Sequence, residues 1–213
     1  MKVLGIIQAH SMIAIVDYGM GNVTSVRNAL ALLGAEGVVT ARSEDLERAT
    51  HIIFPGVGAF SDGMREVRER GLIPLLEKEV LEKKKPFLGI CLGMQLLAST
   101  GEEGGETKGF GFIPGRTRLL KADGLRLPHI GWNDISIVPQ CPLFSGIESR
   151  DFYFVHSYVV EPSDMGATAA TCTYGETFAA AVQKDNIFGV QFHPEKSQKS
   201  GLAVLHNFIN LNA

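Results

Sequence analysis

Three side chains in this sequence are of the types that nucleophilic catalysis needs. Cys91 lies between Gly89 and Gly93, and this Gly-x-nucleophile-x-Gly layout is typical of a sharp turn between a strand and a helix. Much later in the chain, His193 and Glu195 are separated by one proline. A thiol gives its proton to a neighbouring imidazole, and a carboxylate holds that imidazole in the right tautomer. The residue types therefore indicate a Cys-His-Glu triad.

Each motif alone allows another interpretation. Cys91 could be a buried structural cysteine between glycines, and the segment 193–195 could be an exposed loop with a surface ion pair. In an extended segment, His193 and Glu195 would face the same side. A metal site from these three residues is not expected, because no local cluster of ligands accompanies them. The glycines at 19 and 21 do not complete a dinucleotide-binding pattern.

The elements that position these residues follow from the apolar pattern of the chain. Short apolar runs predict strands over 13–16, 37–40, 51–54 and 87–90. Between them we expect helices over 25–33, 43–49 with Ser43 as its cap, and 62–84 with a break at Gly71. This alternation predicts a parallel sheet with helices on its faces. Ligands bind at the carboxyl ends of such strands, where Cys91 is expected.

The second half of the sequence favours short antiparallel strands. We expect them over 116–120, 125–127, 135–138, 151–155, 167–172, 178–183 and 187–192, with a closing helix over 202–211. Asp123-Gly124 indicates a hairpin between the first two. His129, Trp132 and His156 are expected in loops. The fold class is therefore α/β, a mostly parallel central sheet flanked by helices, with added antiparallel strands.

Composition excludes several classes of protein. The 213 residues fit one domain, expected over 12–213, preceded by an extension over 1–11. The net charge of -3 argues against a nucleic-acid partner. No apolar run approaches the roughly 20 residues of a membrane span. Three scattered cysteines argue against a disulfide framework and for a reducing, cytoplasmic setting. No cofactor and no metal ion are expected.

Two motifs together resemble a known superfamily. Segment 89–95, which contains Cys91, and segment 191–195, which contains His193 and Glu195, resemble the triad (class I) glutamine amidotransferases. Further segments are similar, in order, to the glutaminase subunits of imidazole glycerol phosphate synthase from histidine biosynthesis; they are 17–22, 55–58, 101–103, 128–133, 155–158 and 193–197. The resemblance runs from Met12 to the C-terminus. It implies the flavodoxin-like fold of that class.

The resemblance also implies the roles of the triad. Cys91 would attack the side-chain amide of glutamine, His193 would protonate the leaving ammonia, and Glu195 would orient His193. Water would then hydrolyse the glutamyl thioester that remains on Cys91. The oxyanion would be held by the N–H of Leu92 and by the loop that contains Val57 and Gly58. Losing one such donor costs on the order of 10²–10³ in rate.

Further site residues are implied in the same way. The glutamine-binding residues would be Gly56, Gln95, Glu103, His156, Ser157 and Tyr158. Among them, Glu103 would pair with the substrate ammonium, and 156–158 would contribute backbone groups. For the side chain of His129, the residues themselves favour a loop histidine that holds backbone groups.

The resemblance further implies a partner, a (β/α)₈ cyclase subunit that forms a heterodimer with this chain and uses its ammonia. The docking residues would be Asn22, Pro128, Ile130, Trp132 and Lys196, although Trp132 could instead lie in the core. In that family the glycine loop at 56–58 rests with a peptide group turned away, and ligand binding on the partner favours the productive orientation. Three alternatives remain open: the glutaminase of another amidotransferase, a related flavodoxin-like cysteine hydrolase, and a non-catalytic partner module.

Overall fold

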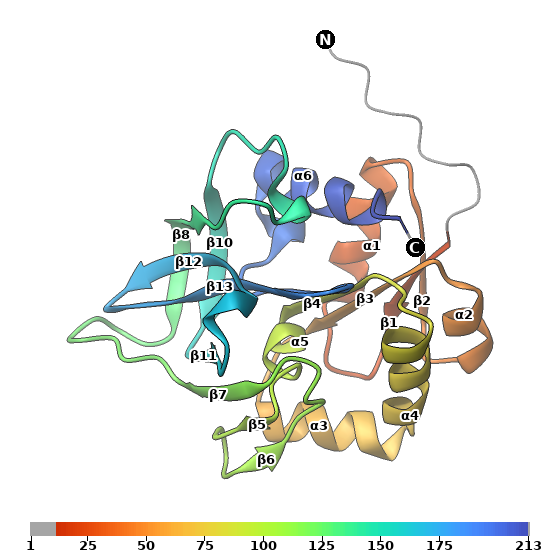
Figure 1. Cartoon of the computed structure of the whole chain (residues 1–213), viewed down its shortest axis with the longest axis horizontal. Coiled ribbons are helices and arrows are strands. Elements are labelled where there is room, and N and C mark those ends of the chain that lie inside the picture. Colours follow the sequence, from red (N-terminus) through yellow and green to blue (C-terminus); the bar gives the residue numbers. More distant parts are fainter. Residues whose placement is uncertain (1–11, 213) are drawn as a thin grey trace.

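The computed structural model describes residues 12–212, so the expected extension over 1–11 lies outside the described residues (Figure 1). Its central sheet has the strand order β2-β1-β3-β4-β14-β13-β12-β9. The first five strands are mutually parallel; they are β2 (Glu36–Thr40), β1 (Met12–Val16), β3 (His51–Gly56), β4 (Phe87–Cys91) and β14 (Ile187–Val190). The last three are antiparallel; they are β13 (Glu176–Lys184), β12 (Thr168–Tyr174) and β9 (Ser136–Ile137). The predicted fold class is confirmed.

Two smaller sheets lie beside the antiparallel end of the central sheet (Figure 1). One pairs β10 (Asp151–His156) with β8 (His129–Asp134). The other has the order β11-β7-β5-β6, formed by β11 (Tyr158–Pro162), β7 (Gly115–Leu119), β5 (Thr100–Gly101) and β6 (Thr107–Lys108). Both small sheets approach the carboxyl end of β4, so their residues can line a site at that edge of the central sheet.

Helices cover both faces of the parallel strands because strand side chains alternate between the faces. Ile13 and Ile15 of β1 pack in one apolar cluster with α1 (Val23–Leu32) and α6 (Gln198–Ile209). Ala14 and Val16 pack in a second cluster with α2 (Ser43–Arg48), α3 (Phe60–Glu69) and α4 (Leu72–Leu76). A π-helical segment, Glu77–Glu82, continues α4, and the four-residue α5 (Leu92–Gln95) follows β4. Three-residue 3₁₀ turns lie at Pro142–Phe144, Met165–Ala167 and Pro194–Lys196.

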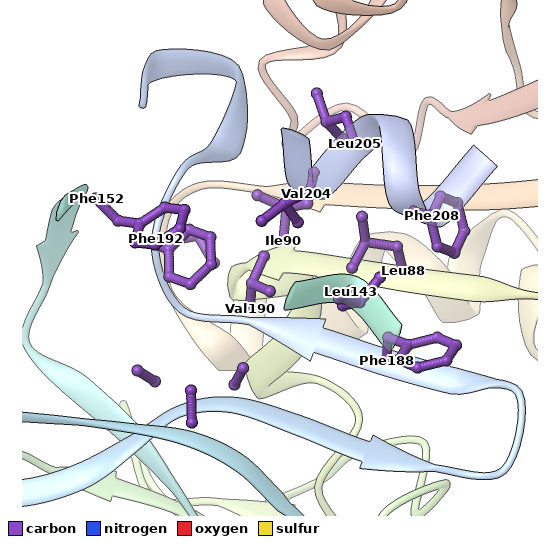
Figure 2. Packing of buried hydrophobic residues seen from close by; sticks show 14 of the residues in the cluster. Leu88, Ile90, Leu143, Phe152, Phe188, Val190, Phe192, Val204, Leu205 and Phe208 are labelled. Atoms are coloured by element: carbon purple, nitrogen blue, oxygen red, sulfur yellow. The ribbon is translucent and has the colours of Figure 1, made fainter. Parts of the chain in front are cut away.

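The first apolar cluster includes side chains of β4 and β14, the two strands that lead into the candidate catalytic residues. Figure 2 shows side chains of α6, among them Val204 and Phe208, packed over Leu88 and Ile90 of β4 and their neighbours on β14. All four of these side chains are at most 1% exposed. Burial of apolar area stabilises by about 25 cal/mol per Å². The ends of β4 and β14 are therefore held in a rigid, parallel register.

Three local expectations were wrong. The turn at Asp123-Gly124 forms, but 125–127 is not a strand, and β7 pairs with β11 and β5 instead. Ser43 does not cap α2; Thr40 Oγ1 accepts from Arg42 N at 3.0 Å and donates to Asp45 at 2.8 Å. Turn and cap signals are local, whereas these pairings depend on distant segments.

The third wrong expectation concerns the loop residues. His129 and Trp132 lie on β8, and His156 is the last residue of β10. Strand β11 was not predicted. Within residues 12–212, none of the helices combines the length and the apolar character needed to cross a bilayer.

Candidate active site

Cys91 ends β4 near the middle of the central sheet, and α5 begins at the next residue. Its backbone has φ 54° and ψ −110°, outside the strand and helix regions, as in a strained strand-to-helix elbow. Close packing requires the flanking glycines. A Cβ on Gly93 would collide with the Phe54 carbonyl oxygen, and one on Gly89 would lie 2.8 Å from Met94 N. The Gly-x-Cys-x-Gly pattern therefore builds the elbow that the sequence predicts.

His193 and Glu195 meet just beyond the end of β14. His193 Nδ1 lies 2.8 Å from Glu195 Oε1, and the two side chains are 2% and 1% exposed. Their contact comes from the 3₁₀ turn Pro194–Lys196 rather than from the alternation of an extended segment. Because the carboxylate accepts, Nδ1 carries the proton, and Nε2 is left buried without a hydrogen-bond partner. This pair is not an exposed surface ion pair.

The charge of His193 is set by its neighbours. Burial lowers the pKa of the imidazole, but the nearby Cys91 and the Glu195 carboxylate outweigh it and raise the pKa to about 10. His193 is therefore cationic at neutral pH between a carboxylate and the cysteine. A neighbouring imidazolium favours the thiolate form of a cysteine. The arrangement can supply both a nucleophile and a proton donor.

The other two cysteines, Cys141 and Cys172, have thiols whose pKa is raised. Burial raises the pKa of Cys141 to about 11. Burial, with the charge of Asp134, raises the pKa of Cys172 to about 12. Both are free and stay protonated at neutral pH, so only Cys91 has an activating partner among the described cysteines.

Two peptide groups next to Cys91 bear on oxyanion binding. Leu92 opens α5, so its N–H has no acceptor within the helix. The Val57 N–H instead donates to the Met20 carbonyl at 2.6 Å. Gly58 follows with φ 106°, a conformation that favours glycine. In this structure the Val57 donor is therefore turned away from the role expected of it.

A cavity of about 460 Å³ opens at Cys91, which is within the range of small-molecule sites. It brings together every residue predicted for the oxyanion hole and for glutamine binding except Gly56. Its lining consists of Val57, Gly58, Ala59, Cys91, Leu92, Gln95, Glu103, Pro128, Val155, His156, Ser157 and Tyr158. Gly56 lies buried beneath the loop, against the hydroxyl of Tyr18. Pro128, predicted for docking, also lines this cavity.

The polar side chains of the cavity are already oriented by the protein. Glu103 Oε2 accepts from the Phe60 N–H at 2.9 Å, at the start of α3. The Gln95 amide group donates to the Tyr158 carbonyl at 3.0 Å and to Gln191 Oε1 at 3.2 Å. That leaves Gln95 Oε1 as the atom without a partner among the described residues. A carboxylate and an amide oxygen are both acceptors, which suit an ammonium group.

Gln191 is a site residue that the sequence analysis missed. It is fully buried, and its Nε2 lies 3.8 Å from Cys91 Sγ. The signal was available, because an uncharged amide at the end of an otherwise apolar strand is unusual in a core.

The residues predicted for docking fall into separate groups. Ile130 and Trp132 alternate on β8 and are 59% and 50% exposed, so Trp132 is not a core residue. The Trp132 ring packs edge-on against the ring of Tyr153 on β10. Lys196 Nζ lies 5.8 Å from the centroid of the Tyr153 ring. These residues form one exposed patch. Asn22 lies directly before α1.

Side-chain grouping gives no metal centre in residues 12–212: nowhere there do three His, Cys, Asp or Glu side chains converge as ligands would.

The sequence matches the family model described as glutamine amidotransferase class-I over residues 14–211. The chain belongs to the class-I glutamine amidotransferase family. Similar curated proteins include imidazole glycerol phosphate synthase subunit HisH 1 of Campylobacter jejuni, 47% identical over 94% of this chain and 100% of that protein. Subunit HisH 2 of Pseudomonas aeruginosa is 46% identical over the same shares, 94% and 100%. Subunit HisH of Moorella thermoacetica is 48% identical over 92% of this chain and 93% of its own length.

Solved structures support the fold of this class-I amidotransferase. PurLQS from Thermotoga maritima matches with a TM-score of 0.75 at 20% identity, over 94% of this chain and 98% of that one. A structure described as a glutamine amidotransferase matches with a TM-score of 0.73 at 22% identity, over 93% and 99%. At such identities the likeness concerns the fold alone.

Proposed function

We propose that this chain is the glutaminase subunit of an imidazole glycerol phosphate synthase and acts in histidine biosynthesis. The observation that carries the proposal is the buried Cys91–His193–Glu195 arrangement beside the cavity, in a chain 46–48% identical to relatives with that name over almost their whole length. The relatives' name also favours this function over another amidotransferase's glutaminase.

The geometry suits hydrolysis of a carboxamide. The Cys91 thiolate attacks the side-chain carbonyl of glutamine, and the resulting oxyanion is held by the Leu92 N–H. His193, cationic through Glu195 and Cys91, gives its proton from Nε2 to the leaving nitrogen. Ammonia departs and a glutamyl thioester remains. Water, deprotonated by the now neutral His193, attacks the thioester and releases glutamate and the thiolate.

The second oxyanion donor links this site to a partner. Val57 N–H is bound to the Met20 carbonyl in the isolated chain, so the hole has one donor where acyl transfer commonly uses two. We infer that docking of a (β/α)₈ cyclase subunit favours a turned peptide that directs a donor into the cavity. The exposed patch of Ile130, Trp132 and Lys196 supports this heterodimer, since aromatic anchors are frequent at interface centres.

The test uses the complex with the cyclase subunit of the same organism. Cys91→Ala should abolish glutamine-dependent synthesis and leave synthesis from added ammonium salt intact. Cys172→Ala is the matched control, because that thiol is buried and its raised pKa keeps it protonated at neutral pH. This variant should keep both activities. Glutamine hydrolysis by Cys91→Ala, or a wild-type complex that works only with ammonia, would refute the proposal.

A further inference from the structure

Two buried histidines outside the triad form a connected pair. His129 and His156 are 2% and 5% exposed, and His129 Nδ1 lies 3.0 Å from His156 Nε2. We propose that this pair is a positioning relay that fixes the groups lining the glutamine cavity. The proposal rests on the proposed function, because it concerns the same site.

The direction of every hydrogen bond in the relay is determined. His156 Nδ1 lies 3.0 Å from the Tyr158 carbonyl, which only accepts, so His156 carries its proton on Nδ1. Its Nε2 is then an acceptor, and His129 donates to it from Nδ1. His129 Nε2 in turn accepts from the Asn133 side-chain amide at 3.3 Å. Both imidazoles are therefore neutral and both carry the proton on Nδ1.

Burial is consistent with this neutral state. It lowers the pKa of His129, and it lowers that of His156 to about 3. A protonated His156 would place its Nε2–H opposite the Nδ1–H donor of His129. The relay is thus intact only while both rings are neutral.

The relay ends in the cavity. The Tyr158 carbonyl that accepts from His156 also accepts from Gln95 at 3.0 Å. Gln95 also donates to Gln191, whose own amide reaches Cys91 Sγ at 3.8 Å. A continuous set of oriented hydrogen bonds therefore runs from Asn133 on β8 to the nucleophile.

Packing alone does not account for a histidine at position 129. Its ring stacks between Tyr174 at 4.1 Å and Phe154 at 5.0 Å, each at an interplanar angle of 23°. Phenylalanine would fill such an aromatic slot without burying two nitrogens, which is costly. The two ring nitrogens of His129 instead form hydrogen bonds with His156 and Asn133. The side chain therefore serves hydrogen bonding.

His129→Phe tests the relay in the complex with the cyclase subunit. It keeps the stacking and removes both nitrogens, which leaves His156 Nε2 without its donor. Glutaminase KM for glutamine should rise about tenfold or more, because an unsatisfied buried acceptor lets His156 and the Tyr158 carbonyl shift. The kcat should change less than about threefold, since no reacting group is altered. An unchanged KM, or a loss confined to kcat, would overturn the proposal.

Two further variants separate positioning from general packing. His129→Asn places an amide N–H near the place of Nδ1, so it should restore KM to within about threefold of wild type. His51→Phe is the matched control, because His51 is also buried and packs edge-on against Phe208. His51 is the first residue of β3, whereas the glutamine cavity lies beyond the last residue of that strand. This variant should leave KM unchanged. If His129→Asn is as impaired as His129→Phe, the relay is refuted.

A measurement on the wild-type protein needs no variant. Long-range ¹⁵N–¹H correlation spectra report which imidazole nitrogen carries the proton. Both His129 and His156 should show the Nδ1–H form between pH 6 and pH 8, assigned by signals lost in His129→Asn and His156→Asn. An Nε2–H form for either ring would contradict the relay directly. Failure of the proposed function looks different, since the wild-type complex would then hydrolyse no glutamine at all.

Discussion

Replacing Glu195 by glutamine tests the electrostatics of the triad. Glu195 Oε1 accepts from His193 Nδ1 at 2.8 Å, and both side chains are almost completely buried. The change keeps the shape of the side chain and removes its charge. The imidazolium then loses one of the two neighbouring groups that raise its pKa to about 10. We expect the pKa of His193 to fall.

The size of the effect follows from that pKa. The difference between 6.5 and about 10 corresponds to about 5 kcal/mol in favour of the protonated ring, at 1.36 kcal/mol per pH unit. Glu195 supplies part of this preference, and a hydrogen bond to a charged partner typically contributes about 1.5–3 kcal/mol. A loss of about 2 kcal/mol lowers the pKa of His193 by about 1.5 pH units, so His193 stays protonated at neutral pH. The loss of kcat/KM therefore appears at alkaline pH, where it approaches roughly thirtyfold above the wild-type pKa.

The assay is kcat/KM for glutamine hydrolysis between pH 5.5 and pH 10.5, in the complex with the cyclase subunit. In the wild type the alkaline loss of activity that reports deprotonation of His193 should lie near pH 10. In Glu195→Gln it should move toward neutrality by more than about one pH unit. Glu47→Gln removes a carboxylate from an exposed ion pair with Lys78 and serves as the control. If the alkaline loss of activity stays at the same pH in Glu195→Gln, Glu195 does not raise the pKa of His193.

Three further changes have defined outcomes. Gly56→Ala would drive a methyl group into the Tyr18 hydroxyl and to 2.9 Å from Leu92 Cβ, so glutaminase activity should be lost while ammonia-dependent synthesis persists. Glu103→Gln should raise KM for glutamine about tenfold, because the substrate ammonium loses its counter-charge; an unchanged KM would remove Glu103 from the site. With the pKa of His156 held near 3, the unfolded chain takes up the extra proton, so stability falls as pH drops below about 6.5. Urea denaturation measures the free energy of unfolding. From pH 7 to pH 4 this free energy should fall by about 3 kcal/mol less in His156→Asn than in the wild type.

The sequence predicted the parallel core and the triad because both depend on local patterns. The apolar run of β3 ends at Gly56, and that of β4 ends at Cys91. The elbow glycines at 89 and 93 are required by backbone contacts within a few residues or with the adjacent strand. Side-chain alternation then assigns each strand residue to a face. The resemblance to a family supplied the roles, and those roles remain predictions until they are measured.

Long-range pairing explains what the sequence did not predict. Arg118 lies on β7, where it binds Glu161 of β11 and Glu176 at the start of β13. Glu176 also accepts from the Lys121 N–H at 2.7 Å, so the segment after β7 is held against the β12–β13 turn rather than folded back as a hairpin. None of these partners is near in sequence. A turn signal at Asp123-Gly124 therefore predicts the bend and cannot predict the pairing.

Long-range contacts also explain why His129 lies on a strand and not in the expected loop. A histidine between proline and isoleucine gives no local sign of burial, and its environment comes from Phe154, Tyr174 and Phe178, all distant in sequence. Strand β8 exposes Ile130 and Trp132 on one side and buries His129 beside His156. One short strand thus carries the proposed docking patch and one end of the proposed relay. A substitution on β8 can therefore alter the cyclase affinity through the patch and the KM for glutamine through His129, and only measurement of both quantities separates the two.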